Sequence, residues 1–306
     1  MAGFSKNDER FRTYALSAPP LRALVTVCAP LALYQALNTI FKILDALMAA
    51  HISSNAVSAV SCLSQITLMI TALGSGLAVG GSIKISEAYG QGDGELMSRR
   101  VATVYAMAGV VSALVAVTLI PFAEPFLRLL QTPEELIETG SSYFRIEVFT
   151  LVVNFFNTVY IAIERSRGHA KKILVLNVVI IVVKLGLSAL FVYVLQGDLV
   201  LIAVASLAGQ LLLCAYAVFS MIRDEGVFRF SVKNISWRRD TTLPILDLSY
   251  PVAAEKMFFA GGKVVVNSMS GLYGSLTVGA LGISNNIGGL TTSWHSGLQD
   301  GAAPLI

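Results

Sequence analysis

The sequence predicts an all-helical, polytopic membrane protein. Hydrophobic residues make up 55% of the 306-residue chain and charged residues only 13%, whereas soluble globular chains carry about 45–50% apolar and about 25% charged residues. The mean hydropathy is +0.70. Residues 56–83 contain no Asp, Glu, Lys or Arg, and this run exceeds the roughly 20 residues that a helix needs to cross a bilayer. The core of a soluble protein does not accommodate apolar runs of this length, so we expect the helices to lie in a membrane.

Apolar runs between charged or turn-rich breaks predict eight membrane-spanning helices. The fourth run contains Arg145 and Glu147, and the seventh contains Glu255, Lys256 and Lys263, so these two are the least apolar. The eight predicted spans cover residues 21–47, 56–83, 101–123, 141–163, 173–195, 199–222, 245–270 and 277–306.

Lysine and arginine residues gather in alternate connections between the predicted spans. The N-terminal segment has four, and the second, fourth and sixth connections have three, four and five. The first, fifth and seventh connections have none, and the third has only Arg128. Because basic connections stay on the cytoplasmic side of a membrane, we expect a multi-pass protein of the inner or plasma membrane with a cytoplasmic N-terminus.

Composition gives no indication of nucleic-acid binding or of a metal centre. The net charge is only +3, and Cys28, Cys62 and Cys214 lie in apolar runs without metal-ligand spacing. The ATP-binding pattern GxxxxGK[ST] is absent from the sequence. We therefore expect no cofactor other than a coupling ion, Na⁺ or H⁺.

The seventh and eighth predicted spans repeat the first and second. A shift of 221 positions aligns Pro251 with Pro30 and Lys263 with Lys42, and it gives 14 identities over the 56 positions 30–85 without a gap. Six spans separate the two copies, so both begin on the same side of the membrane. Such parallel repeats occur in transporters whose halves are related by an axis along the membrane normal.

The repeat also predicts how the chain is divided. We expect a cytoplasmic segment at 1–14, a six-helix lobe at 15–225, a basic cytoplasmic linker at 226–243 and the first two helices of a second lobe at 244–306. Because the second copy stops at the equivalent of Ile85, the expectation is a truncated second lobe that lacks about four spans of a two-lobe transporter. We expect a monomer in the lipid bilayer.

Three stretches resemble the multidrug and toxic compound extrusion (MATE) family. "APLALYQALNTIFKILDALMAA" resembles its first helix, with Pro30 followed by Asp45, and "GSGLAVGGSIKISEAYGQGDGE" resembles its second helix and the next turn. "YPVAAEKMFFAGGKVVVNSM" resembles its seventh helix, with Glu255 one turn after the proline and a Gly-Lys pair ending in Lys263. The resemblance implies a MATE-like fold and antiport, in which a Na⁺ or H⁺ gradient drives export of an amphipathic, cationic organic compound.

Acidic residues inside the spans are the candidate cation-coupling residues. A carboxylate in the bilayer costs a few kcal/mol unless it faces a cavity or a cation. The alternative for Asp45 is an interfacial residue that caps its helix or pairs with Lys42 one turn away. The predicted cation-coupling residues are Asp45, Glu255 and Asp300.

Basic residues inside the spans are candidates for the substrate cavity. Lys42 and Lys263 occupy equivalent positions in the two copies, so we expect them to face a central cavity, with snorkelling to the interface as the alternative. Lys184 either pairs with Asp45 or lines the substrate path, and His295 is a further candidate for the cavity. Pro30, Pro251, Gly76 and Gly80 are expected at helix contacts or hinges, because small residues let helices approach closely.

Three functions are alternatives to drug export. A flippase for lipid-linked saccharides is the alternative within the same superfamily, but the mixture of acidic and basic residues favours export. A passive channel would need a filter loop, and none is apparent. The stretch 90–93, Gly-Gln-Gly-Asp, matches the GxGD pattern of intramembrane proteases, but the sequence has no Tyr-Asp pair to supply the second catalytic aspartate. We therefore expect a transporter and not an enzyme.

Overall fold

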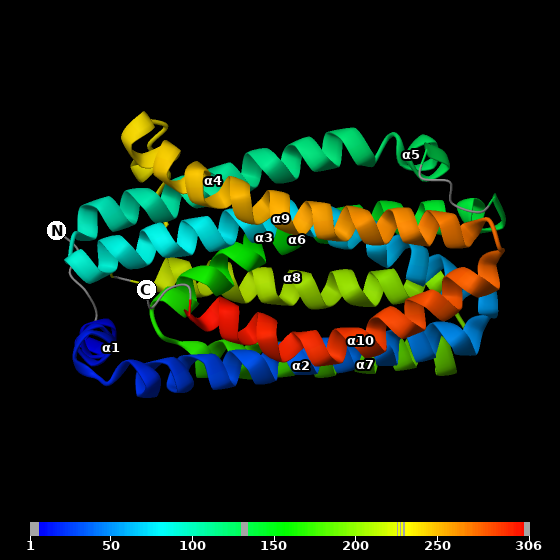
Figure 1. Ribbon diagram of the computed structural model, residues 1–306, viewed down its shortest axis with the longest axis horizontal. Coiled ribbons are helices and arrows are strands. Elements are labelled where there is room, and N and C mark those ends of the chain that lie inside the picture. The colour runs from blue at the N-terminus through cyan, green and yellow to red at the C-terminus, as the bar shows by residue number, and fades with distance from the viewer. Residues whose placement is uncertain (1–5, 130–133, 225, 227, 229, 303–306) are drawn as a thin grey trace.

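Long helices run side by side along the longest axis of the molecule (Figure 1). The computed structural model describes residues 6–129, 134–224, 226, 228 and 230–302. The short helix α1 lies at one end of the bundle and α5 at the opposite end (Figure 1), and these are called the α1 end and the α5 end below. The helices are α1 (Lys6–Ser17), α2 (Pro20–Ile52), α3 (Ser54–Gln91), α4 (Gly94–Leu119), α5 (Ala123–Leu129), α6 (Glu134–Ser166), α7 (Ala170–Ala189), α8 (Leu199–Arg223), α9 (Arg239–Gly271) and α10 (Ser275–Ala302).

Six helices of the described part are long and apolar enough to cross a membrane: α2, α3, α4, α6, α7 and α8. They match the first six predicted spans. The predicted seventh and eighth spans form α9 and α10, which are 33 and 28 residues long and are not among these six. A π-helical turn, Leu190–Val194, continues α7 toward the α5 end, and a 3-10 turn, Val232–Asn234, precedes α9.

Tight turns join successive helices at the α1 end. Gly92 has a φ of 76°, a left-handed conformation that residues with a Cβ rarely adopt. The carboxylate of Asp93 then accepts a hydrogen bond of 3.0 Å from the backbone nitrogen of Leu96, so Asp93 caps α4. Gly168, with a φ of 76°, makes the corresponding turn between α6 and α7. The GxGD pattern is therefore explained by a helix-to-helix turn.

The helices of the second copy pack chiefly on the helices of the first. α9 packs on α3, and α10 packs on α2 and α3. A Cβ added to Gly76 would lie 2.7 Å from the backbone nitrogen of Ala253, so the backbones of α3 and α9 are in close contact there. Gly80 of α3 makes the same kind of contact with Ser249. Pro30 and Pro251 lie inside α2 and α9.

Two large apolar clusters form most of the core of the first lobe, and a small third cluster lies between α2 and α7. One includes Phe144 and Phe155 of α6 and occupies the half of the bundle nearer to α5. The other includes Met97 of α4 and Ile163 of α6 and occupies the half nearer to α1. α7 instead exposes Val175, Val179 and Val182, which fits a lipid-facing surface of a membrane helix.

Candidate functional site

An ion pair inside the bundle joins α2 to α7. The ammonium nitrogen of Lys184 donates a hydrogen bond to Oδ2 of Asp45. The side chain of Lys184 keeps 25% of its surface exposed and that of Asp45 keeps 16%. Asp45 Oδ1 is buried and has no hydrogen-bond partner among the described residues. One carboxylate oxygen is therefore bound by Lys184, and the other is buried without a hydrogen-bond partner among the described residues.

α6 brings a second carboxylate to this ion pair. Glu147 interacts electrostatically with both Lys184 and Asp45, and it shares a hydrogen bond with the Tyr143 hydroxyl one turn earlier. Asp45 lies seven residues before the C-terminal end of α2, which is about 10 Å along a helix. The site is therefore in the half of the bundle nearer to α5.

Two further lysines complete what we call the intramembrane charge cluster. Lys42, one turn before Asp45 on α2, interacts electrostatically with Asp45, Lys184 and Lys263. Lys263 comes from α9, so the second copy contributes to the cluster. Because charges within a bilayer persist when they are paired or face a water-filled cavity, the cluster is the candidate functional site. Its members are Lys42, Asp45, Tyr143, Glu147, Lys184 and Lys263.

The structure brings two of the residues predicted from the sequence, Asp45 and Lys184, into direct contact, and Lys42 is close enough to be influenced by their charges and by that of Lys263. The ion-pair partner of Asp45 is Lys184, and the alternative of pairing with Lys42 is not what the structure shows. The sequence predicts no role for Glu147, which is only one of two charges that interrupt the fourth span. An acid inside an otherwise apolar run is the signal that identifies it.

Three other candidates lie apart from the cluster or outside the described side chains. Glu255 is exposed on α9, two turns before Lys263, and has no ion-pair partner among the described residues. His295 is exposed on α10. The side chain of Asp300 lies outside the described residues. The roles predicted for these three residues stay predictions.

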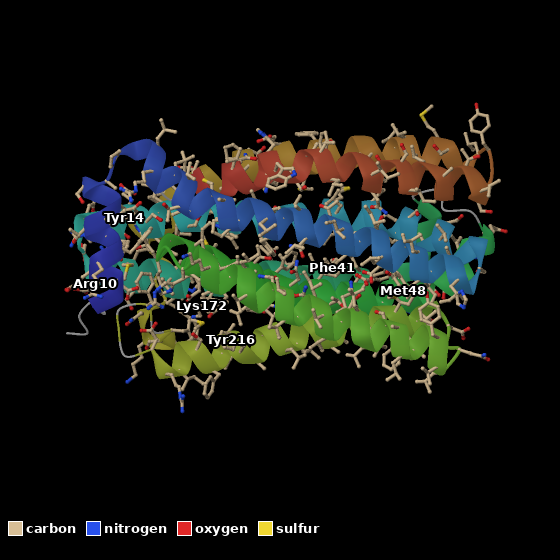
Figure 2. All side chains as sticks on the ribbon, turned by 90° about the horizontal axis from the view of Figure 1, so that it is seen from below. Arg10, Tyr14, Phe41, Met48, Lys172 and Tyr216 are labelled. Carbon is tan, nitrogen blue, oxygen red and sulfur yellow. The ribbon has the colours of Figure 1, made fainter. Side chains whose placement is uncertain are left out.

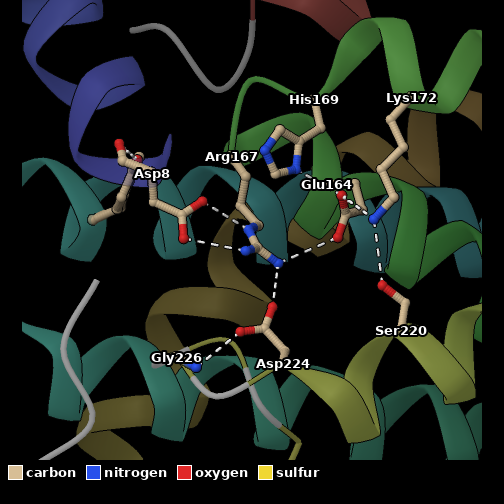
Figure 3. Close-up of polar contacts among 9 residues, drawn as sticks. Asp8, Glu164, Arg167, His169, Lys172, Ser220, Asp224 and Gly226 are labelled. Carbon is tan, nitrogen blue, oxygen red and sulfur yellow. Dashed lines mark hydrogen bonds and ion pairs between the residues drawn. The ribbon is translucent and has the colours of Figure 1, made fainter. Parts of the chain in front are cut away.

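A second polar cluster, the Arg167 network, lies at the α1 end (Figure 3). Arg167, in the turn between α6 and α7, donates hydrogen bonds of 3.0 and 3.1 Å to the two carboxylate oxygens of Asp8 in α1. It also donates to Asp224 at the end of α8 (2.6 Å) and to Glu164 (3.3 Å). The other Glu164 oxygen contacts Lys172 at 3.0 Å. These contacts pair three carboxylates with two cations, and they connect α1, the turn between α6 and α7, and the end of α8.

The Arg167 network is buried, which indicates a structural role. Asp8 is 1% exposed, Glu164 2% and Arg167 8%. Burial alone would lower the pKa of the Arg167 guanidinium, but its hydrogen bonds to Asp8 and the negative charges of Glu164 and Asp224 outweigh burial and raise that pKa. Arg167 therefore stays charged at physiological pH, and removal of one partner leaves a buried charge without compensation.

Helix α1 is fixed to the bundle by more than this ion pair. Arg12 donates hydrogen bonds of 3.2 and 2.9 Å to the carbonyl oxygen of Gly90, at the end of α3. Figure 2 shows Arg10 and Tyr14 of α1 at the same end of the bundle as Lys172 and Tyr216, and Met48 toward the other end. The sequence does not predict this network, because its members lie in the connections between spans or at the ends of spans.

Six membrane spans, a repeated helix pair and a charge cluster inside the bundle define a multi-pass membrane protein of the repeat-built transporter class. The profile of the MatE family matches residues 30–190, and the chain belongs to this family. It is a family of transporters and not of enzymes, as the sequence predicted.

Curated relatives support the same assignment. The chain is 26% identical over 278 residues to the probable multidrug resistance protein YpnP of Bacillus subtilis, with 89% of this chain and 61% of YpnP covered. It is 23% identical over 294 residues to YoeA of the same organism, also a probable multidrug resistance protein, with 92% of this chain and 63% of YoeA covered. The chain thus spans less than two thirds of the length of these relatives.

Solved structures share the fold. A crystal structure of MATE in complex with MaL6 superposes with a TM-score of 0.85 at 19% identity, over 99% of this chain and 66% of the other. An outward-facing multidrug resistance MATE transporter superposes with a TM-score of 0.84 at 19% identity, over 98% and 66%. A transporter of the same superfamily from Pyrococcus furiosus, described as having a binding pocket of reverse polarity, gives 0.76 at 19% identity, over 98% and 70%. The all-helical, MATE-like fold predicted from the sequence is confirmed.

Proposed function

We propose that the full-length protein is a secondary antiporter that exports amphipathic organic compounds, cationic drugs among them, driven by a Na⁺ or H⁺ gradient. The proposal includes an N-terminus in the cytoplasm, which would place the α1 end inside and the α5 end outside. Support comes from the membership of the MatE family, from the drug-resistance relatives and from the intramembrane charge cluster.

The observation that carries the proposal is the pair of Asp45 and Lys184. A cation that reaches the buried, unpartnered Oδ1 of Asp45 competes with the Lys184 ammonium for the same carboxylate. Proton or Na⁺ binding would weaken the link between α2 and α7, and loss of the ion would restore it. A change in the contact between two helices of one lobe is the kind of event that can bias alternating access.

Substrate-linked ion flux in proteoliposomes of the full-length protein tests this function. We expect export of rhodamine 123, an amphipathic organic cation, only when an H⁺ or Na⁺ gradient is imposed, and loss of that coupling in Asp45→Asn. The matched control is Asp198→Asn, which changes an exposed aspartate at the start of α8. Export that persists after both gradients are collapsed, or full coupling in Asp45→Asn, would disprove the mechanism.

A lipid-linked saccharide flippase of the same fold remains a less favoured alternative. Both named curated relatives are probable multidrug resistance proteins, and the cluster contains carboxylates as well as lysines. Transfer of a fluorescent lipid-linked saccharide in the same vesicles, without export of any dye, would favour the flippase.

A further inference from the structure

Phe228, in the connection between α8 and α9, is held by two side chains of the first lobe. This connection, residues 224–238, leads from the last helix of the first lobe to the second copy of the repeat. Phe228 is 2% exposed. The centre of its ring lies 4.4 Å from the guanidinium carbon of Arg167 and 5.7 Å from the centre of the Tyr89 ring, which meets it edge to face. Cation–π and aromatic contacts of this kind are favourable, so they fix the connection to the first lobe.

The same two side chains hold helix α1. Arg167 donates hydrogen bonds of 3.0 and 3.1 Å to the two carboxylate oxygens of Asp8, and the Tyr89 hydroxyl donates a hydrogen bond to the backbone carbonyl oxygen of Asp8. A guanidinium is planar, with its donors along the edge and its faces open to aromatic rings. Asp8 therefore fixes the edge of the plane on whose face Phe228 packs. Helix α1 and the connection, which lie at opposite ends of the first lobe in the sequence, thus share one attachment.

Arg167 also holds the first residues of the connection. It donates a hydrogen bond of 2.6 Å to Oδ2 of Asp224, and Oδ1 of Asp224 accepts one of 2.9 Å from the backbone nitrogen of Gly226 (Figure 3). One guanidinium is thus bound at the same time by Asp8 of α1 and by Asp224 of the connection. Loss of the Asp8 contacts would remove two of the hydrogen bonds that orient Arg167, so the contacts of Arg167 with Asp224 and Phe228 would weaken too.

Helix α1 is suited to reversible docking. It is only 12 residues long, and its sequence, KNDERFRTYALS, is mostly polar. Pro19 and Pro20 separate it from α2, and proline interrupts the hydrogen bonding of a continuous helix. Short segments with few buried apolar contacts open at a low cost in free energy. Release of α1 therefore does not require any membrane span to unfold.

We propose that α1 is a regulatory strap: when docked, it orients Arg167 and Tyr89 and so holds the connection between α8 and α9 on the first lobe, and when released, it frees the connection. The coupling is reciprocal, because a contact that stabilises the docked connection also stabilises docked α1. Its consequence for transport rests on the proposed export function. Since α9 begins at the end of the connection, a held connection restrains movement of the second copy against the first lobe. Docked α1 thereby slows the exchange between inward-facing and outward-facing states.

Hydrogen–deuterium exchange of the purified full-length protein in detergent micelles tests the coupling. Arg12→Gln removes the hydrogen bonds between α1 and the carbonyl oxygen of Gly90, which is not a residue of the connection. We expect the backbone amides of α1 and those of the connection, Ser236 among them, to exchange about fivefold faster together. Phe228→Leu, which removes the aromatic ring from its contacts with Arg167, should in turn raise the exchange of α1.

Arg10→Gln is the matched control, because Arg10 is an exposed arginine of the same helix. It should leave the exchange of both segments as in the wild type. Faster exchange of α1 alone in Arg12→Gln, or of the connection alone in Phe228→Leu, would overturn the proposal. If neither substitution changes exchange, deletion of residues 2–17 decides: the connection must then exchange faster, and unchanged protection of the connection refutes the strap.

Export assays separate failure of this inference from failure of the export function. In proteoliposomes with an imposed gradient, Arg12→Gln should export rhodamine 123 severalfold faster than the wild type, because α1 no longer restrains the connection. Equal export rates, together with faster exchange of both segments, would refute the regulatory role. Absence of export by the wild type would refute the export function, while hydrogen–deuterium exchange would still decide whether α1 holds the connection.

Discussion

Gly279 of α10 packs against Ser58 of α3, and these two residues are equivalent positions of the 221-residue repeat. One turn further, Gly282 of α10 packs against Ser61, which is again its own equivalent. Residues that contact their own equivalents lie beside a two-fold axis, as in isologous contacts between identical subunits. An approximate two-fold axis therefore passes between α3 and α10.

The helices on either side of that axis make reciprocal contacts. Gly76 of α3 packs on Ala253 of α9, and the equivalent Gly297 of α10 packs on the equivalent Ala32 of α2. In each copy, the second helix thus packs on the first helix of the other copy. The gapless shift in the sequence and these reciprocal contacts are two independent observations of the same repeat.

The first prediction concerns Gly76→Ala. A Cβ at this position would lie 2.7 Å from the backbone nitrogen of Ala253, so α3 and α9 must move apart. We expect a loss of about 1–3 kcal/mol in the free energy of unfolding, the usual cost of overpacking, measured by thermal unfolding of the full-length protein in detergent. Gly288→Ala is the control, because nothing lies within 4 Å of a Cβ there. Equal melting temperatures for the two variants would contradict the close contact.

The second prediction concerns Asp8→Asn in the Arg167 network. The change removes the negative charge that receives two hydrogen bonds from Arg167, and hydrogen bonds to charged groups contribute about 1.5–3 kcal/mol. We expect α1 to separate more often from the bundle. Trypsin should then cleave after Arg10 or Arg12 several times faster in the folded, full-length protein, because local opening exposes these sites.

Glu9→Gln is the matched control for Asp8→Asn, since Glu9 is an exposed acid next to Asp8. It should leave the cleavage rate as in the wild type. Unchanged cleavage in Asp8→Asn would mean that α1 is held instead by the hydrogen bonds of Arg12 to Gly90 and by Phe11, which packs against Gly168.

Much of the fold was predictable from the sequence because the bilayer imposes local requirements. A helix that crosses the membrane must form its backbone hydrogen bonds internally and be apolar over its length. Apolar runs such as residues 56–83 can therefore be recognised as spans from the sequence alone. The repeat was predictable for a similar reason, since equivalent positions at one interface face the same packing requirements. The small helices α1 and α5 were not predicted, because their sequences are short and mixed in polarity.

The sequence does not determine which charged residues pair with each other. Asp45 and Lys184 are 139 positions apart, and Asp8 and Arg167 are 159 positions apart. Which lysine meets Asp45 depends on how α2 and α7 are rotated against each other, and composition does not determine that rotation. The nearest lysine in the sequence, Lys42, is not the ion-pair partner of Asp45, which pairs with Lys184 of α7.

The third prediction concerns Glu147, the acid of α6 in the charge cluster. Glu147→Gln keeps the size of the side chain and its capacity to accept a hydrogen bond from Tyr143, but it removes a negative charge beside Lys184. Lys184 then depends on Asp45 alone, so we expect gradient-driven export to shift along the pH axis while the melting temperature changes little. Glu134→Gln, an exposed acid at the start of α6, should leave the pH profile unchanged. An unshifted profile in Glu147→Gln would remove Glu147 from the coupling site.

The last prediction is a double-mutant cycle on Asp45 and Lys184. Asp45→Asn leaves the Lys184 ammonium without its carboxylate, and Lys184→Gln leaves Asp45 with both oxygens unpaired. Breaking a fully buried ion pair costs about 3–5 kcal/mol, and less is expected here because the side chains keep 16% and 25% of their surface exposed. The double variant removes both charges, so it should recover part of the loss in the free energy of unfolding, and the coupling energy should exceed about 1 kcal/mol. The control cycle uses Glu95 and Arg99, an exposed pair on α4 at 2.6 Å, where we expect no more than about 0.5 kcal/mol. Equal coupling energies in the two cycles, measured by thermal unfolding in detergent, would mean that the Asp45 and Lys184 pair is screened like a surface pair and does not link α2 to α7.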